Sequence, residues 1–322
     1  MTCVGARRRI AEGEATRAGR RADAPKRSLA SVRGHSPLRR FREAYAEQRA
    51  AEGRGDGGEA ELLALPYISR SPRAAQWRIR ARTFDRFVRS VLAPLARRRA
   101  PRPLRVLDLG AGNGWLCHRV ARHGHRAAAV DLRDDEVDGL GAAVGYSAHL
   151  GARMFDRIAA SFEALPLADD SFDVVVFNAS LHYALDLRTA LAEAARVVAP
   201  GGRVAILDSP FYRSNDAGDA MVAEKRERAA DRFGERADAL TALSFIEYLT
   251  PASLAEASAG LDLEWRRHRV RYPLGYELRP LIARLRGRRR PSRFDVWEAA
   301  VPRRPDDGAS SRSDHEGGRP TP

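Results

Sequence analysis

Cysteine, lysine and long apolar runs are all scarce in this sequence of 322 residues. The two cysteines, Cys3 and Cys117, exclude a disulfide framework and a zinc site with four thiolate ligands, and they are typical of a reducing compartment. No run approaches the roughly 20 apolar residues that span a bilayer. A secretory signal would require an apolar stretch after the arginines at positions 7–9, and none follows them. We therefore expect a cytoplasmic protein with no membrane contact.

Positive charge is abundant but unevenly distributed, with a net charge of +14. Residues 1–60 carry 14 basic and 8 acidic side chains, residues 265–322 carry 15 and 7, and the segment between them is neutral. Basic ends can indicate nucleic-acid binding. Here Lys26 and Lys225 are the only lysines, and an excess of arginine and alanine over lysine is typical of coding bias in a GC-rich genome. Nucleic acid is therefore disfavoured as a partner, though not excluded.

Composition divides the chain into a central folded domain and two unfolded ends. Residues 1–60 are rich in Arg, Ala, Gly and Glu and have few large apolar side chains, so burial cannot offset their ordering entropy. We expect residues 1–60 to be disordered, or to precede the true start of translation. The tail, residues 302–322, is predicted to be disordered for the same reason. The folded domain is predicted to span residues 61–301.

Within that domain the pattern alternates between strands and helices. Apolar residues from Trp77 to Leu92 recur at spacings of three and four, which predicts an amphipathic helix ended by Pro94 and the prolines that follow. Buried strands are predicted at 104–109, 127–131, 172–177 and 203–208, and helices at 115–123 and 187–198 with a turn at 200–202. A mostly helical insertion is predicted at 213–249, and a further helix starts at Thr250-Pro251. Two late strands at 261–271 and 293–301 are predicted to form a sheet edge. Such alternation predicts a parallel sheet covered on both faces.

A glycine-rich loop follows the first strand, with the sequence Asp108-Leu-Gly110-Ala-Gly112-Asn-Gly114. Glycines there permit a tight turn and a close approach of ligand to backbone, next to the free N–H groups of the following helix. Trp115 occupies the position where a dinucleotide-binding G-x-G-x-x-G motif has its third glycine. The loop instead resembles that of the class I S-adenosylmethionine-dependent methyltransferases with a type 11-like domain.

Further elements in the order of that family extend the resemblance over about residues 104–210. Asp131 ends the second strand, where the family has an acidic residue that bonds both ribose hydroxyls. Residues 161–166 match the loop that meets the adenine, and residues 197–203 match the turn before the fifth strand. The resemblance implies a doubly wound, mostly parallel seven-stranded sheet with a helical N-terminal cover, and S-adenosylmethionine as the cofactor. It implies no metal and these cofactor-binding residues: Asp108, Gly110, Ala111, Gly112, Asn113, Gly114, Asp131, Leu132, Ser161, Phe162 and Asn178.

Each of these residues also has a purely structural interpretation. The three glycines can be ordinary turn glycines, Asp131 can be the N-cap of a helix over 133–138, and Asn113 can serve a left-handed turn. Cys117 is expected in the core. Many family members have Asp at the position of Ser161, and a serine hydroxyl accepts a hydrogen bond from the adenine amino group only weakly.

The methyl acceptor is expected at the ends of the fourth and fifth strands. His182 is the candidate general base, because its unperturbed pKa of roughly 6.5 suits proton removal near neutrality; a capping or packing role is the alternative. Asp208 or Tyr212 can contact the acceptor or form a structural turn. Tyr67, Arg70 and Arg80 precede the sheet, where by resemblance a helix covers the methionine end and an arginine can pair the carboxylate; a solvated surface position is the alternative for each arginine. The insertion at 213–249 is a candidate lid.

These observations favour a methyltransferase that acts on an O, N or C atom of a small molecule. The neutral middle of the chain has no basic groove, and Asn178-Ala-Ser-Leu stands where amino-methylating enzymes have Asn-Pro-Pro-aromatic. Alternatives are an RNA or protein methyltransferase that uses the basic ends, a non-catalytic S-adenosylmethionine-binding partner of another enzyme, and a nicotinamide oxidoreductase. The acceptor and the oligomeric state are left open.

Overall fold

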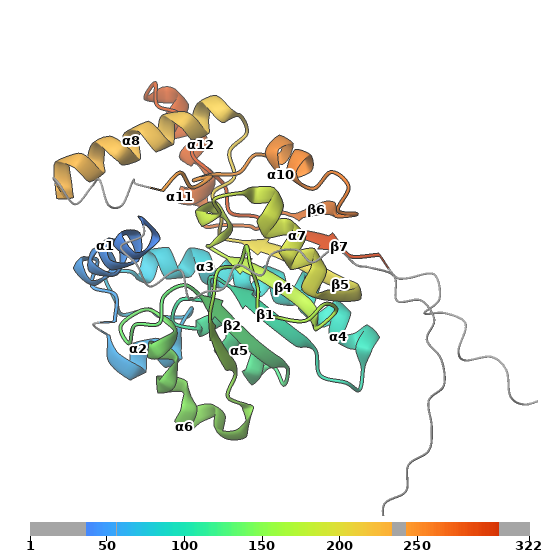
Figure 1. The fold of residues 1–322 in the computed structure, drawn as a ribbon. Coiled ribbons are helices and arrows are strands. Elements are labelled where there is room, and N and C mark those ends of the chain that lie inside the picture. The colour runs from blue at the N-terminus through green and yellow to red at the C-terminus, as the bar shows by residue number, and fades with distance from the viewer. Residues whose placement is uncertain (1–36, 56, 234–242, 303–322) are drawn as a thin grey trace, which may run out of the picture.

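A computed structural model describes residues 37–55, 57–233 and 243–302 (Figure 1). The strands are β1 (Arg105–Leu109), β2 (Arg126–Asp131), β3 (Asp156–Ala159), β4 (Phe172–Asn178), β5 (Val198–Leu207), β6 (Glu264–His268) and β7 (Val296–Ala300). The helices are α1 (Pro37–Ala51), α2 (Gly58–Ala64), α3 (Ala74–Phe87), α4 (Ala93–Arg99), α5 (Trp115–Arg122), α6 (Ser147–Leu150), α7 (Leu187–Val197), α8 (Asn215–Phe233), α10 (Pro251–Ala257), α11 (Leu274–Glu277) and α12 (Arg279–Leu285). The disorder predicted for residues 1–36 and 303–322 lies outside the described residues.

The strands form one seven-stranded sheet in the order β3-β2-β1-β4-β5-β7-β6. The first five are parallel, and β7 runs antiparallel to both of its neighbours, β5 and β6. This confirms the predicted doubly wound, mostly parallel sheet. The order reverses between β1 and β4, the switch point beside which ligands bind in open α/β sheets. The two late strands are confirmed, but only β6 lies at the sheet edge.

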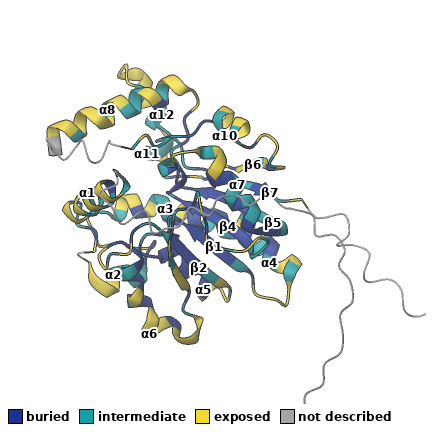
Figure 2. Ribbon diagram, in the orientation of Figure 1, coloured by how far each residue is buried: buried dark blue, intermediate teal, exposed yellow. Residues whose placement is uncertain are grey.

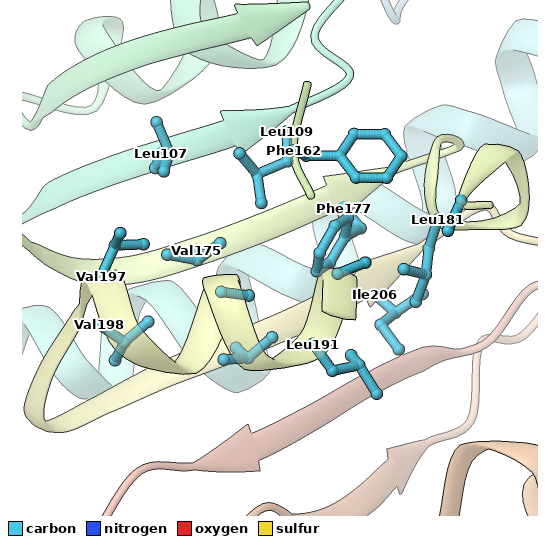
Figure 3. Close-up of a cluster of buried hydrophobic side chains, with 14 of the residues drawn as sticks. Leu107, Leu109, Phe162, Val175, Phe177, Leu181, Leu191, Val197, Val198 and Ile206 are labelled. Carbon is cyan, nitrogen blue, oxygen red and sulfur yellow. The ribbon is translucent and has the colours of Figure 1, made fainter. Parts of the chain in front are cut away.

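Alternate side chains of each central strand point into two separate hydrophobic cores, one on each face of the sheet. Leu107, Val175 and Ile206 face α7, whose Leu191 packs against the same cluster (Figure 3). Their sequence neighbours point the other way. Figure 2 shows that the central strands are buried along most of their length. A strand covered on both faces needs apolar residues at nearly every position, which is why these segments read as continuous apolar runs.

The opposite face of the sheet is covered by α3, α4 and α5. Val106 and Val176 pack with Phe84 and Phe87 of α3 and with Leu116 of α5, all of them fully or almost fully buried. The predicted helix over 77–92 is therefore confirmed as a core element. It does not end at Pro94. A π-helical turn over Val88–Leu92 leads into α4, and this local change of hydrogen bonding accommodates the missing proline N–H.

The largest correction concerns residues 37–60, for which the composition predicts disorder. They contain α1 and α2. The ring of Phe41 lies 4.6 Å from that of Phe245, and Tyr45 lies 5.6 Å from Tyr183 (centroid distances). These partners come from loops that are far away in the sequence, so the composition of residues 1–60 carries no sign of them.

Smaller differences occur at three places. The strand β3 is not among the predicted strands, because its polar residues occupy a sheet edge and only Ile158 packs against the core. The predicted turn at 200–202 is instead an irregularity within β5, with the pairing to β4 shifted beside it. The helix predicted at Thr250 is confirmed as α10, and its first turn is closed by a capping box between Thr250 and Ser253.

The insertion predicted at 213–249 is helical in α8, whereas its residues 243–249 are not helical and its residues 234–242 lie outside the described part of the chain. In Figure 1, α8 lies at the same end of the molecule as α12. Arg289 links the two regions through an ion pair with Glu224, 2.8 Å between Nε and Oε1. Across the described ranges, no helix is long and apolar enough to cross a membrane.

The loop between β1 and α5 turns sharply at Gly110. Its φ is +74°, and an added Cβ would lie 2.3 Å from Cβ of Ser180. The backbone N–H groups of Gly110 and Ala111 both donate to the carbonyl of Val130, at 2.8 and 3.0 Å. This position therefore requires glycine for two reasons, the left-handed backbone and the close approach of Ser180.

We predict that Gly110→Ala lowers the free energy of unfolding by roughly 2–5 kcal/mol, the sum of left-handed strain and overpacking. Gly124→Ala is the matched control, because Gly124 has a φ of +83° but nothing within 4 Å of an added Cβ. It should cost only about 1–2 kcal/mol. Urea unfolding followed by circular dichroism measures both. Equal losses in the two variants would show that contact with Ser180 is unimportant.

Candidate functional site

The carboxylate of Asp131 anchors the glycine loop at the carboxyl end of β2. Its Oδ2 accepts the backbone N–H of Gly112 at 2.7 Å, and its Oδ1 accepts that of Arg133 at 2.8 Å. Burial raises the pKa of Asp131, while these two donors oppose the shift. Residues 133–138 are not helical, so the interpretation of Asp131 as a helix N-cap is wrong.

Asn113 connects the loop to the start of α5. Its Oδ1 accepts the N–H of Trp115 at 3.2 Å, and its Nδ2 donates to Oδ1 of Asp138 at 3.1 Å. Asn113 is not among the residues with positive φ, so the left-handed-turn interpretation is wrong. Cys117 is buried in the core as expected, with its thiol against the carbonyl of Ala128.

A cavity of about 350 Å³ opens above this loop. That volume falls in the range of small-molecule sites. Nine of the residues predicted to bind the cofactor or act in catalysis line it: Gly110, Ala111, Gly112, Asn113, Asp131, Leu132, Phe162, Asn178 and His182. At Gly112 an added Cβ would lie 3.4 Å from the carbonyl oxygen of Asp138, an ordinary van der Waals distance.

Three predicted residues do not line the cavity. Asp108 is fully buried beneath the loop, and burial together with Asp131 raises its pKa well above the usual range. Gly114 packs against the ring of Phe155. The hydroxyl of Ser161 accepts the N–H of Glu163 at 3.2 Å, in a local turn. Of the segment before the sheet, Arg80 lines the cavity, but Tyr67 and Arg70 do not.

Helix α1 and its neighbours form an aromatic wall that the sequence alone did not predict. Phe41, Tyr45, Tyr183 and Phe245 contact one another with ring centroids 4.6–6.4 Å apart. The hydroxyls of Tyr45 and Tyr183 lie 3.3 Å apart. The one available signal was the i, i+4 spacing of Phe41 and Tyr45, which places two aromatic rings on the same side of a helix.

Arginines from α1 and α3 border the same cavity. Arg49 donates from Nε to Asp138 at 2.9 Å, which ties α1 to the loop after β2. Arg54 is only 5 % exposed, and its Nε has no hydrogen-bond partner among the described residues. Burial, together with Arg49 and Arg80, lowers the pKa of Arg54 to about 10. Arg80 stacks over Trp77 at 5.0 Å and makes no ion pair within the described part of the chain. Positive charge here is incompletely balanced.

His182 stands on the cavity wall after β4. Its Nδ1 is 3.5 Å from the hydroxyl of Ser209, and its ring lies 4.3 Å from that of Tyr183. Burial lowers the pKa of His182 to about 3, with the positive charges of Lys225 and Arg80 adding to the effect. The imidazole is therefore neutral near pH 7 and is a weak base.

Asp208 follows β5 and also lines the cavity. It is 8 % exposed, its φ is +51°, and neither carboxylate oxygen has a hydrogen-bond partner among the described residues. Burial raises the pKa of Asp208 to about 6, and the nearby charge of Arg80 and hydroxyl of Thr83 limit that rise. A buried carboxylate that no well-formed hydrogen bond satisfies is costly, so this side chain does not serve stability. Tyr212, the alternative contact for the acceptor, lines a different cavity.

Comparisons with known proteins find related methyltransferases. Residues 107–206 match the family described as a methyltransferase domain. The malonyl-[acyl-carrier protein] O-methyltransferase of Methylococcus capsulatus is 33% identical over 208 residues, which are 63% of this chain and 70% of that protein. The protein of the same name from Halorhodospira halophila is 39% identical over 104 residues, 32% of this chain and 34% of that protein.

The chain therefore spans only about a third of the length of some of the relatives it matches. A solved structure of the 1,6-didemethyltoxoflavin-N1-methyltransferase from Burkholderia thailandensis is 18% identical, covers 87% of this chain and 93% of its own, and has a TM-score of 0.47. The family match, the coverage of the Methylococcus relative and the strand order of the sheet together show that the chain belongs to the class I S-adenosylmethionine-dependent methyltransferases.

Proposed function

We propose that this chain transfers a methyl group from S-adenosylmethionine to an O, N or C atom of a small molecule. One observation carries the proposal. A single cavity joins the glycine loop and Asp131 to the aromatic wall formed by Phe41, Tyr45 and their partners. Cofactor and acceptor can therefore meet in one cavity. The cavity is of small-molecule size, which favours such an acceptor over a folded nucleic acid.

The residues on the cofactor side fit S-adenosylmethionine. Each oxygen of Asp131 accepts one backbone N–H, and a carboxylate oxygen has a second lone pair, so the side chain can still accept from two ribose hydroxyls. Gly110 and Gly112 line the cavity without side chains, so a ligand can approach the backbone closely there. Phe162 supplies an aromatic contact for the adenine. We assign the methionine carboxylate to Arg54 or Arg80, the guanidiniums that lack a full set of partners.

The bound cofactor supplies an electrophilic methyl carbon on a sulfonium with a good leaving group. The protein then has three tasks: to orient the acceptor, to exclude water and to receive any proton released. The aromatic wall performs the first two. For the third, Asp208 suits neutral pH better than His182, because a proton acceptor works best when its pKa is near the operating pH. His182 remains a candidate hydrogen-bond acceptor.

The chemical class of acceptor is left broad by the relatives. They include malonyl-[acyl-carrier protein] O-methyltransferases, and a further relative from Mycolicibacterium paratuberculosis is named demethylmenaquinone methyltransferase, 34% identical over 104 residues. An RNA or protein acceptor held by the basic ends would make activity depend on residues 1–60. Deleting those residues would also remove Phe41, Tyr45 and Arg49 from the cavity wall, so a loss of activity would not discriminate between the acceptors.

The first test is the affinity for S-adenosylmethionine, measured by titration calorimetry. Asp131→Asn keeps an oxygen for the loop but removes the negative charge, and it should weaken binding by about tenfold to a hundredfold, as expected for hydrogen bonds to a charged group. Asp156→Asn is the control, because Asp156 is exposed on β3 and does not line the cavity. An Asp131→Asn variant that binds S-adenosylmethionine as tightly as the wild type would refute the assignment of Asp131.

The second test concerns the buried carboxylate of Asp208. Its folded-state pKa is raised above the unfolded value, so the folded state favours the neutral acid. The contribution to stability is complete below about pH 4 and is lost as the pH rises through about 6. Urea unfolding from pH 4 to 8 should therefore show wild-type stability falling by about 2–3 kcal/mol relative to Asp208→Asn.

A matched control is available at Asp262, another aspartate with positive φ, at +52°, but exposed. Asp262→Asn should follow the wild-type pH profile, because its carboxylate is solvated in both states. Parallel stability profiles for the wild type and Asp208→Asn would mean that Asp208 has donors in solution. Burial of this carboxylate would then carry no unfavourable free energy for a bound acceptor to relieve.

A further inference from the structure

A second cavity, of about 290 Å³, lies beyond β5 and shares no lining residue with the first. Its walls come from the segment after β5, from β6 and β7, from α11 and α12, and from the stretch that follows α12. They include Arg213, Arg267, Arg279, Arg290, Arg293 and Asp295, together with aromatic and proline side chains. Five arginines thus face one carboxylate.

That carboxylate, Asp295, is already fully engaged. It accepts Nε of Arg267 at 2.7 Å, Nε of Arg293 at 3.1 Å and the backbone N–H of Val270 at 2.8 Å. Arg293 also pairs with Glu277 at 2.8 Å. These ion pairs hold two of the five guanidiniums in place and leave Asp295 no capacity to balance the others.

The remaining three arginines, Arg213, Arg279 and Arg290, have no carboxylate partner within residues 37–55, 57–233 and 243–302. Arg279 stacks over the ring of Tyr276 at 4.5 Å. Stacking restrains the guanidinium plane and leaves most of its N–H donors available. Arg213 and Arg290 are exposed. Three uncompensated guanidiniums around one hollow make a local positive potential that an anion would neutralise.

We propose that this second cavity binds a phosphate ester or diphosphate. A carboxylate carries one charge and would leave two of the three guanidiniums unbalanced. A phosphoryl group carries up to two charges and accepts paired N–H bonds from the planar guanidinium fork. The aromatic and proline side chains of the walls can pack against the organic part of the ester. This inference does not depend on the proposed function.

The surface beside the cavity is unusually apolar. Five apolar side chains on α11, α12 and the residue between them are exposed, up to 77 % for Leu285: Leu274, Leu278, Leu281, Ile282 and Leu285. The same two helices supply Tyr276, Arg279 and Pro280 to the cavity. An ester with an apolar tail could therefore lie with its phosphate among the arginines and its tail along the leucines. A lipid headgroup and a soluble phosphate ester share this chemistry, and the experiment must separate them.

Pyrophosphate is the probe, titrated calorimetrically into the full-length chain at low and at moderate salt. We expect saturable binding that weakens as the salt concentration rises. The double variant Arg279→Gln/Arg290→Gln should bind at least tenfold more weakly. Arg266→Gln is the control, because Arg266 is exposed on β6 next to Arg267 but does not line the cavity. Absence of saturable binding, or an equal loss in the control, would overturn the proposal.

Vesicles distinguish the two sources of phosphate. If the chain cosediments with phosphatidylglycerol vesicles but not with phosphatidylcholine vesicles, and pyrophosphate releases it, the ligand is a lipid headgroup. If pyrophosphate binds but neither vesicle does, the ligand is a soluble ester. Binding of S-adenosylmethionine by the double variant should equal that of the wild type, because the two cavities are separate. A shared loss would point to unfolding, and an unchanged melting temperature excludes that explanation.

Discussion

The attachment of the glycine loop to the carboxyl end of β2 determines the geometry of the whole site. The carbonyl of Val130 accepts two N–H groups from the loop, and Asp131 accepts a third. These bonds fix the floor of the first cavity and the start of α5 together. Asp131 also keeps unused lone pairs toward the cavity, so the same side chain can support the loop and receive a ligand. Asp131 therefore both holds the loop in place and can bind the ligand.

The core of the fold was predictable because its signals are local. The strands β1 and β4 are mostly apolar, the loop glycines lie between strand and helix, and Thr250-Pro251 starts a helix through its own capping chemistry. The cofactor side of the cavity follows from the same local motifs, since most of its residues lie within a few positions of a strand end.

The rest of the site depends on contacts between distant segments. Phe41 and Tyr45 are two rings in an arginine-rich stretch, and they become a wall only because Tyr183 and Phe245 meet them. Arginine content alone was likewise uninformative. What matters is which guanidiniums have carboxylate partners, as Arg293 does with Glu277 and Arg279 does not, and that pairing exists only in the folded chain.

Asp208 shows how a backbone conformation places a functional group. In β5, Ala205 and Leu207 face the α3 side of the sheet, so strict alternation would send the next side chain toward α7. The left-handed φ of Asp208 breaks the alternation, and its carboxylate lies within electrostatic reach of Arg80 on α3, beside the cavity. Aspartate tolerates this conformation better than most residues, though at some cost. A strained backbone and an unsatisfied acid at one position both lower stability. Their coincidence at the cavity wall is expected where binding of an acceptor, rather than folding, satisfies the carboxylate.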